Sequence, residues 1–226
     1  MSAQGSAPRA TLDLKIRVWG MGSNDRPFSQ SAVAQNISST GACIFGIEPE
    51  LKVGDVIGVQ YETRKARCKV VWVVNAGALK KTQVGVQLVA DQECPWLAVL
   101  PPEMKSDERT QIRHDNRRQF VRHRISFPLE LRDERVNTPL RVNATDISGN
   151  GCYVETAMPL AVATALRADI WIGDERITAG AVVRTHDPGV GMGIEFVGMP
   201  PDSKKRLQDH LDKQDPGIMQ GRKDTQ

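Results

Sequence analysis

Arginines cluster in one short segment of the chain. Arg117, Arg118, Arg122 and Arg124 fall within eight consecutive residues, just before a stretch that is typical of a β-strand. A guanidinium is a planar, permanently charged fork of donors, which suits phosphate oxygens and the O6/N7 edge of guanine. In an extended or loosely coiled segment, Arg118 and Arg122 can both turn toward one ligand. By themselves, these arginines indicate only a basic surface.

A second motif, one strand and a turn downstream, supplies complementary groups. Asp146, Ser148 and Gly151 form an Asp-x-Ser-x-x-Gly pattern. The carboxylate accepts hydrogen bonds, the hydroxyl donates or accepts them, and the glycine lets the backbone approach a ligand closely. The same residues are also good turn formers, and Arg117 and Arg124 could equally line a solvated basic face. Taken together with the arginines, the motif predicts a guanine-nucleotide site.

The composition limits the class of protein. With 226 residues and 24.9 kDa, the chain suits one large domain or two of about 100 residues. A net charge of +3 does not suggest bulk wrapping of nucleic acid. The N-terminus has no signal-peptide core, and no apolar run approaches the roughly 18 residues of a membrane-spanning helix. The four cysteines form no CxxC pair, which predicts reduced thiols, a cytoplasmic location and no zinc site.

Sequence motifs of common enzymes are missing. The chain has no Walker A loop, no HExxH or GxSxG pattern, and no histidines at metal-ligand spacing. The adjacent acidic pairs at 107–108 and 174–175 fit turn and linker charges better than an acid/base couple. We therefore expect neither catalysis nor a bound cofactor.

Short alternating stretches run along the chain with no long helical pattern between them. Residues 12–18, 56–61 and 84–89 are examples, separated by turns that contain glycine or proline. Regularly spaced short strands predict an all-β fold, a small barrel or sandwich. We expect the four tryptophans in core or inter-domain packing, and His114 and His123 at the surface.

The same order of motifs occurs twice. Residues 36–41 (Asn-Ile-Ser-x-x-Gly) match residues 146–151 (Asp-Ile-Ser-x-x-Gly) at an offset of 110. Residues 84–89 match residues 192–197 at an offset of 108. Ordered matches with so small a drift indicate an internal duplication that produced two modules.

The second copy resembles the PilZ domain family. The resemblance rests on the RxxxR and Asp-x-Ser-x-x-Gly motifs in this order, with 24 residues from Arg122 to Asp146, and covers about residues 117–212. It implies a six-stranded barrel that binds the bacterial second messenger cyclic di-GMP. It also implies that the ligand is bound by Arg118, Arg122, Asp146, Ser148 and Gly151, with Arg117 assisting.

By this resemblance the chain is two PilZ-like barrels in tandem, each followed by a short helix. The first barrel, residues 10–100, has no RxxxR motif, so it is a degenerate copy that is not expected to bind the nucleotide alone. A linker at 101–116 precedes the PilZ domain at 117–214, and residues 215–226 form a flexible tail.

The function implied is that of a cyclic di-GMP receptor without enzymatic activity. Binding at the second barrel would order residues 113–124 and rearrange the linker and barrels toward a protein partner. Two alternatives stay open: a PilZ-like protein–protein interaction module that binds no nucleotide, and a nucleic-acid binder that uses residues 105–124. The 5% aromatic content disfavours base stacking, so we expect no DNA or RNA partner. The sequence leaves open the protein partner, a homodimer, and whether one ligand or a stacked pair binds.

Overall fold

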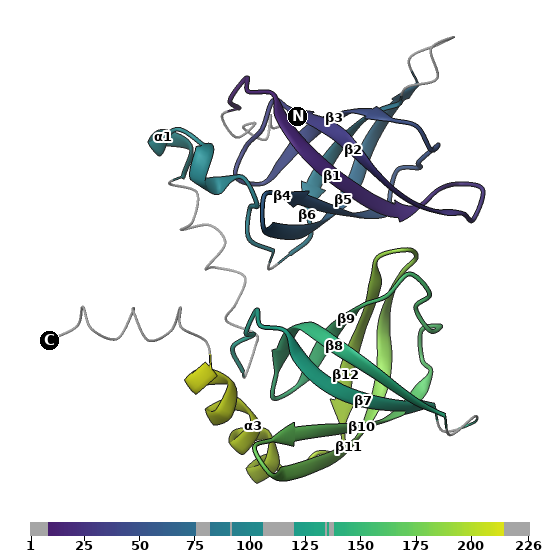
Figure 1. The fold of residues 1–226 in the computed structure, drawn as a ribbon, viewed down its shortest axis with the longest axis vertical. Coiled ribbons are helices and arrows are strands. Elements are labelled where there is room, and N and C mark those ends of the chain that lie inside the picture. The colour runs from purple at the N-terminus through teal and green to yellow at the C-terminus, as the bar shows by residue number, and fades with distance from the viewer. Residues whose placement is uncertain are drawn as a thin grey trace, which may run out of the picture. The chain divides into compact units, whose positions relative to one another are not determined.

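The chain folds into two compact units, each built around a closed six-stranded barrel (Figure 1). The computed structural model describes residues 9–75, 82–90, 92–105, 120–133, 135 and 138–214. The predicted all-β fold with two six-stranded barrels is confirmed. None of the helices within the described ranges has the length and apolar character needed to cross a membrane.

The first barrel closes in the strand order β1-β2-β3-β6-β5-β4, and each neighbouring pair is antiparallel. Along β1, Ile16 and Val18 are buried while Lys15 and Arg17 are exposed, as expected for a strand with one face on a core. The strands are β1 Leu14–Met21, β2 Pro27–Gln35, β3 Gly41–Ile47, β4 Val56–Tyr61, β5 Arg64–Asn75 and β6 Thr82–Leu88.

The second barrel repeats this topology, because its order β7-β8-β9-β12-β11-β10 places the strands as in the first. Its core includes Leu131, Ile147, Val154, Ile170 and Phe196. The strands are β7 Phe127–Asp133, β8 Pro139–Ser148, β9 Gly151–Glu155, β10 Ala165–Ile172, β11 Glu175–Asp187 and β12 Gly191–Val197. The shared strand order agrees with the internal duplication inferred from the sequence.

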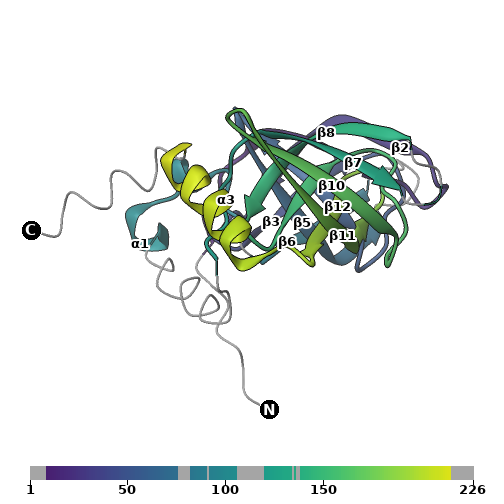
Figure 2. The same cartoon turned by 90° about the horizontal axis from the view of Figure 1, so that it is seen from below.

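Among the described residues, a helix of several turns follows only the second barrel. This helix, α3 (Pro201–Gln214, yellow in Figure 2), packs on the second barrel through Leu207 and Leu211, which are fully buried. After the first barrel, the described residues form a 3₁₀ turn at Leu97–Val99 and the single-turn helix α1, Pro102–Lys105. The sequence predicted a short helix after each barrel, so the two copies differ here.

Only part of the Asp-x-Ser-x-x-Gly motif forms a turn, although all of its residues are good turn formers. Asp146 and Ser148 lie on β8, and the turn itself is residues 149–150, since Ser148 already pairs with Gly151 at the start of β9. A register shift between Ala144 and Asp146 interrupts the β8–β9 ladder. Bulges of this kind locally re-aim side chains, which affects the residues considered next.

Candidate functional site

The arginine segment is fixed to β8 by two backbone hydrogen bonds. The amide of His123 donates to the carbonyl of Ile147 (2.8 Å), and the amide of Ile147 donates to the carbonyl of His123 (2.9 Å). Both residues are fully buried. In an antiparallel pair, the neighbours of His123 in sequence lie opposite the neighbours of Ile147. The side chains of these neighbours point to the other face of the sheet from those of His123 and Ile147.

This register brings together charged groups from two distant parts of the sequence. Arg122 is placed opposite Ser148, and Arg124 opposite Asp146, on the face that points away from the core. The Asp146 carboxylate is itself mostly buried, with 7% of the residue exposed, and its Oδ1 lies 3.7 Å from Nε of Arg124. Arg124 was left outside the predicted site, but its guanidinium forms an ion pair with the predicted carboxylate.

The charges of Arg122 and Asp146 both affect the pKa of the buried Cys152 thiol. Burial raises the pKa of Cys152 to about 12, while the positive charge of Arg122 lowers it and the negative charge of Asp146 raises it. The backbone register places Arg122 opposite Ser148 and two residues from the position opposite Asp146. Arg122, Asp146 and Ser148 therefore converge at the end of β8.

Ser148 and Gly151 have structural roles in the hairpin. The Ser148 hydroxyl accepts a hydrogen bond from the Asn150 amide (3.3 Å) and donates one to the Gly151 carbonyl (3.4 Å). A Cβ atom at Gly151 would overlap the carbonyl oxygen of Ile194 on β12. The motif predicted that this glycine lets a ligand approach closely, whereas in the structure its missing side chain lets β9 pack against β12.

Two of the predicted ligand residues, Arg117 and Arg118, lie outside the described residues, as does His114. The structure therefore places Arg122, Asp146, Ser148 and Gly151 from the predicted set. Their position at one end of a strand, facing outward, provides a cationic group, a buried carboxylate and a hydroxyl for a polar ligand.

Sequence reasoning missed a polar residue of α3 that contacts both halves of the site. The Gln208 side chain is buried; its Oε1 accepts from the Gly149 amide (3.0 Å), and its Nε2 donates to the Val121 carbonyl (3.0 Å). The same Nε2 donates to Oδ1 of Asp212 (3.0 Å). The signal was present in the sequence, because Gln208 follows Leu207 on the face of the helix that also carries Leu211.

His123 was predicted at the surface, and this was wrong. Its ring is fully buried, and Nε2 lies 2.8 Å from Oδ1 of Asp212 and 2.8 Å from Nε2 of Gln208. A buried histidine needs such polar partners, and α3 supplies them. The helix thus holds both the backbone and a side chain of the arginine segment.

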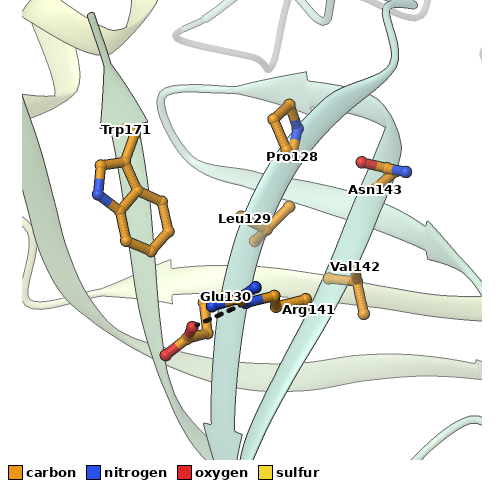
Figure 3. A pocket seen from close by; sticks show the side chains of 7 residues that line it. All are labelled: Pro128, Leu129, Glu130, Arg141, Val142, Asn143 and Trp171. Carbon is orange, nitrogen blue, oxygen red and sulfur yellow. Dashed lines mark ion pairs between the residues drawn. The ribbon is translucent and has the colours of Figure 1, made fainter. Parts of the chain in front are cut away.

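A separate hollow of about 310 Å³ lies on the outer face of β7, β8 and β10 (Figure 3). In Figure 3 the indole of Trp171 stands beside β7, and Glu130 forms an ion pair with Arg141 (3.7 Å). Of the tryptophans expected in core or inter-domain packing, Trp96 is fully buried, whereas Trp171 is 42% exposed and does not pack in the core of its barrel. None of the predicted ligand residues that the structure describes lines this hollow.

The four cysteines are free and buried, and the described residues contain no group of three or more potential metal ligands. Burial raises the pKa of the Cys94 and Cys152 thiols to about 12 and raises that of Cys68 further. At pH 8 these thiols are protonated and out of reach of reagents. We expect Ellman's reagent to modify the native protein slowly and the denatured protein at all four cysteines. Rapid modification of Cys152 in the native protein would contradict its placement.

Comparison with known proteins identifies one family. The model of the PilZ domain matches residues 116–213. A search of curated protein sequences gives no match.

Solved structures that resemble the chain include two complexes with c-di-GMP. MrkH of K. pneumoniae in such a complex is 14% identical, with 94% of this chain and 90% of that chain covered and a TM-score of 0.42. YcgR of Escherichia coli, also with c-di-GMP, is 14% identical, with 94% and 88% covered and a TM-score of 0.41. The motility inhibitor MotI/DgrA of Bacillus subtilis is 14% identical, with 91% and 97% covered and a TM-score of 0.37. At these identities and scores, the family assignment rests on the PilZ match alone.

Proposed function

Since residues 116–213 of the chain are a PilZ domain, we propose that the protein is a cyclic di-GMP receptor that binds the dinucleotide at the second barrel. The observation that carries the proposal is the antiparallel pairing of His123 with Ile147, which aligns Arg122 with the end of β8. This pairing supports the proposal because it sets Arg122, the second arginine of RxxxR, next to the Asp-x-Ser-x-x-Gly motif, which is far away in sequence.

Each group has a task that the ligand's chemistry defines. Arg122 binds a phosphate or the O6/N7 edge of guanine, or stacks on the base, and Arg118 acts with it. Asp146 is acceptor-only when ionised, which matches the N1–H and N2–H₂ donors of guanine. Ser148 braces the hairpin and offers its hydroxyl to a phosphate, while Gly151 and Arg117 complete the proposed set.

The effect of ligand binding would be transmitted through the segment that carries the arginines and through α3. Ligand binding would change how residues 120–124 are held against β8 and, because Gln208 contacts Val121 and Gly149, how firmly α3 is held. A protein partner would read this change, together with a rearrangement of the linker. We propose a cytoplasmic location, which suits four free buried thiols, and leave a homodimer open.

Isothermal titration of cyclic di-GMP into the full chain tests the proposal. With protein at roughly 20 µM, a receptor should give saturable heat, and the stoichiometry separates a single ligand from a stacked pair. An oligonucleotide serves as the control, because nonspecific binding to phosphates weakens steeply with salt. Absence of heat with cyclic di-GMP would favour the alternative, an interaction module of PilZ fold that binds no nucleotide.

The contacts of Gln208 predict a measurable loss on replacement. Gln208→Ala removes the partners of the Gly149 amide and the Val121 carbonyl, so we expect cyclic di-GMP affinity to fall about three- to tenfold. Hydrogen exchange at the Gly149 amide should accelerate in the same variant. Gln214→Ala, at the exposed end of α3, is the matched control. Unchanged affinity and unchanged exchange in Gln208→Ala would remove α3 from the relay.

A further inference from the structure

The first barrel contains a pocket at the place where the second barrel has its candidate site. Its volume is about 190 Å³, and the side chains that line it include Arg9, Asn36, Thr40, Trp72 and Gln87. All of these residues belong to the same compact unit. This copy is predicted to be degenerate, because no RxxxR motif precedes its first strand.

The backbone shows that Arg9 occupies the position of Arg122. Ala10 and Ile37 exchange hydrogen bonds of 2.8 and 3.0 Å, and this pair corresponds to His123 and Ile147 in the second barrel. Arg9 precedes Ala10 as Arg122 precedes His123. One arginine of the site is therefore retained in the first barrel, although no motif reveals it.

The acidic residues around the second site are replaced by amides in the first. Asn36 stands where the duplication has Asp146. Gln87 pairs with Gly41 in the register in which Glu195 pairs with Gly151. A carboxylate only accepts hydrogen bonds, whereas a carboxamide both donates and accepts. The pattern of donors and acceptors in the pocket has therefore changed at two independent positions.

This change alters which base fits. The edge of guanine that carries N1–H and N2–H₂ presents donors and requires acceptors. Adenine presents the N6 amino donor beside the N7 acceptor, and asparagine or glutamine matches both atoms at once. The amides of Asn36 and Gln87 therefore suit adenine better than guanine.

The indole ring of Trp72 and the positive charge of Arg9 complete the pocket. The pyrrole ring of Trp72 covers Gly85 so closely that a Cβ atom there would overlap it. Stacking on an aromatic side chain holds a base without regard to its edge, so Trp72 would supply affinity and the amides selectivity. Arg9 is exposed at the rim, and its charge acts on the nearby Cys43 thiol, whose pKa is raised mainly by burial.

We propose that the first barrel binds an adenine mononucleotide, with the base on Trp72, its edge on Asn36 and Gln87, and the phosphate on Arg9. The volume of about 190 Å³ is below that of typical ligand pockets, which suits one base and not a cyclic dinucleotide. The inference does not depend on cyclic di-GMP binding at the second barrel, because the two sets of residues are distinct.

Titration of the full chain with AMP and with GMP tests this site. We expect AMP to bind at one site per chain and GMP at least about tenfold more weakly. Asn36→Asp should reverse the preference, and the fold should tolerate it, because Asn36 has a φ of 48° and aspartate also adopts the left-handed region. Trp72→Leu and Arg9→Ala should each weaken AMP binding by about tenfold or more.

Arg122→Ala is the control, because it alters the second barrel only and should leave AMP binding unchanged. Three results would each overturn the proposal. These are no saturable AMP binding up to about 1 mM, equal affinity for AMP and GMP, or AMP binding that is lost in Arg122→Ala and kept in Arg9→Ala. Failure of cyclic di-GMP to bind would leave this site unaffected, so the two proposals fail separately.

Discussion

Replacing Arg122 with alanine should weaken cyclic di-GMP binding by about ten- to a hundredfold. Hydrogen bonds to charged groups contribute about 1.5–3 kcal/mol each, which corresponds to this range of dissociation constants. Arg122 is placed opposite Ser148 at the end of β8, so its loss removes the cation at the centre of the proposed site. Isothermal titration of both proteins measures the effect.

The matched control for this variant is Arg176→Ala, which removes an exposed arginine from β11. It lowers the net charge by the same amount and should leave the affinity within about twofold of wild type, because charges beyond a Debye length are screened. Thermal unfolding checks that Arg122→Ala is folded. Equal losses in the two variants would mean that binding responds to overall charge, and the site would be misplaced.

Replacing Gly151 with alanine should destabilise the second barrel by about 2–3 kcal/mol. The added methyl group would overlap the carbonyl oxygen of Ile194, and a backbone oxygen can move only if the β9–β12 pairing changes. Gly41→Ala places a methyl group against the carbonyl of Val86 in the same way, so it should destabilise the first barrel comparably. Denaturant unfolding of the three proteins measures both effects.

The Gly151 variant also separates two roles for this residue. If the glycine serves the barrel, the stability falls and Gly41→Ala behaves in parallel. If it serves ligand approach, as the sequence motif suggested, Gly151→Ala would keep wild-type stability and lose only cyclic di-GMP binding. That second outcome would contradict the structural role described here.

The fold was largely predictable because local patterns dictate it. Alternation such as that of Ile16 and Val18 in β1 identifies strands, and the repeated Asn/Asp-Ile-Ser-x-x-Gly motif shows that whatever barrel forms will form twice. Strand order and closure, in contrast, depend on non-local pairing. They were expected only through the resemblance to a family.

The candidate site was predictable in composition and less so in arrangement. Asp146 and Arg122 could be chosen from motif spacing, but the ion pair of Asp146 with Arg124 depends on the pairing of His123 with Ile147, which no spacing reveals. The burial of His123 depends on α3, which lies more than 75 residues further along the chain. Tertiary contacts of this kind override the surface preference of a polar residue.

The exposed position of Trp171 has a similar cause. A tryptophan in a strand is usually expected in a core, but strand residues alternate between faces, and Ile170 takes the inward position while Trp171 points outward. Around Trp171, both odd-numbered and even-numbered positions carry apolar residues. The alternation of residues therefore did not show which side chains of the strand face the core. Only the closed barrel fixes which residues of β10 face inward.

Mapping of amide chemical shifts in the full chain during titration with cyclic di-GMP tests the central claim most directly. The claim is that the ligand binds where Arg122, Asp146 and Ser148 converge. We predict that the largest shifts occur at residues 120–124 and 146–151, followed by those around Gln208, which contacts both segments. Largest shifts around Trp171 or in the first barrel, with residues 146–151 unchanged, would contradict the account.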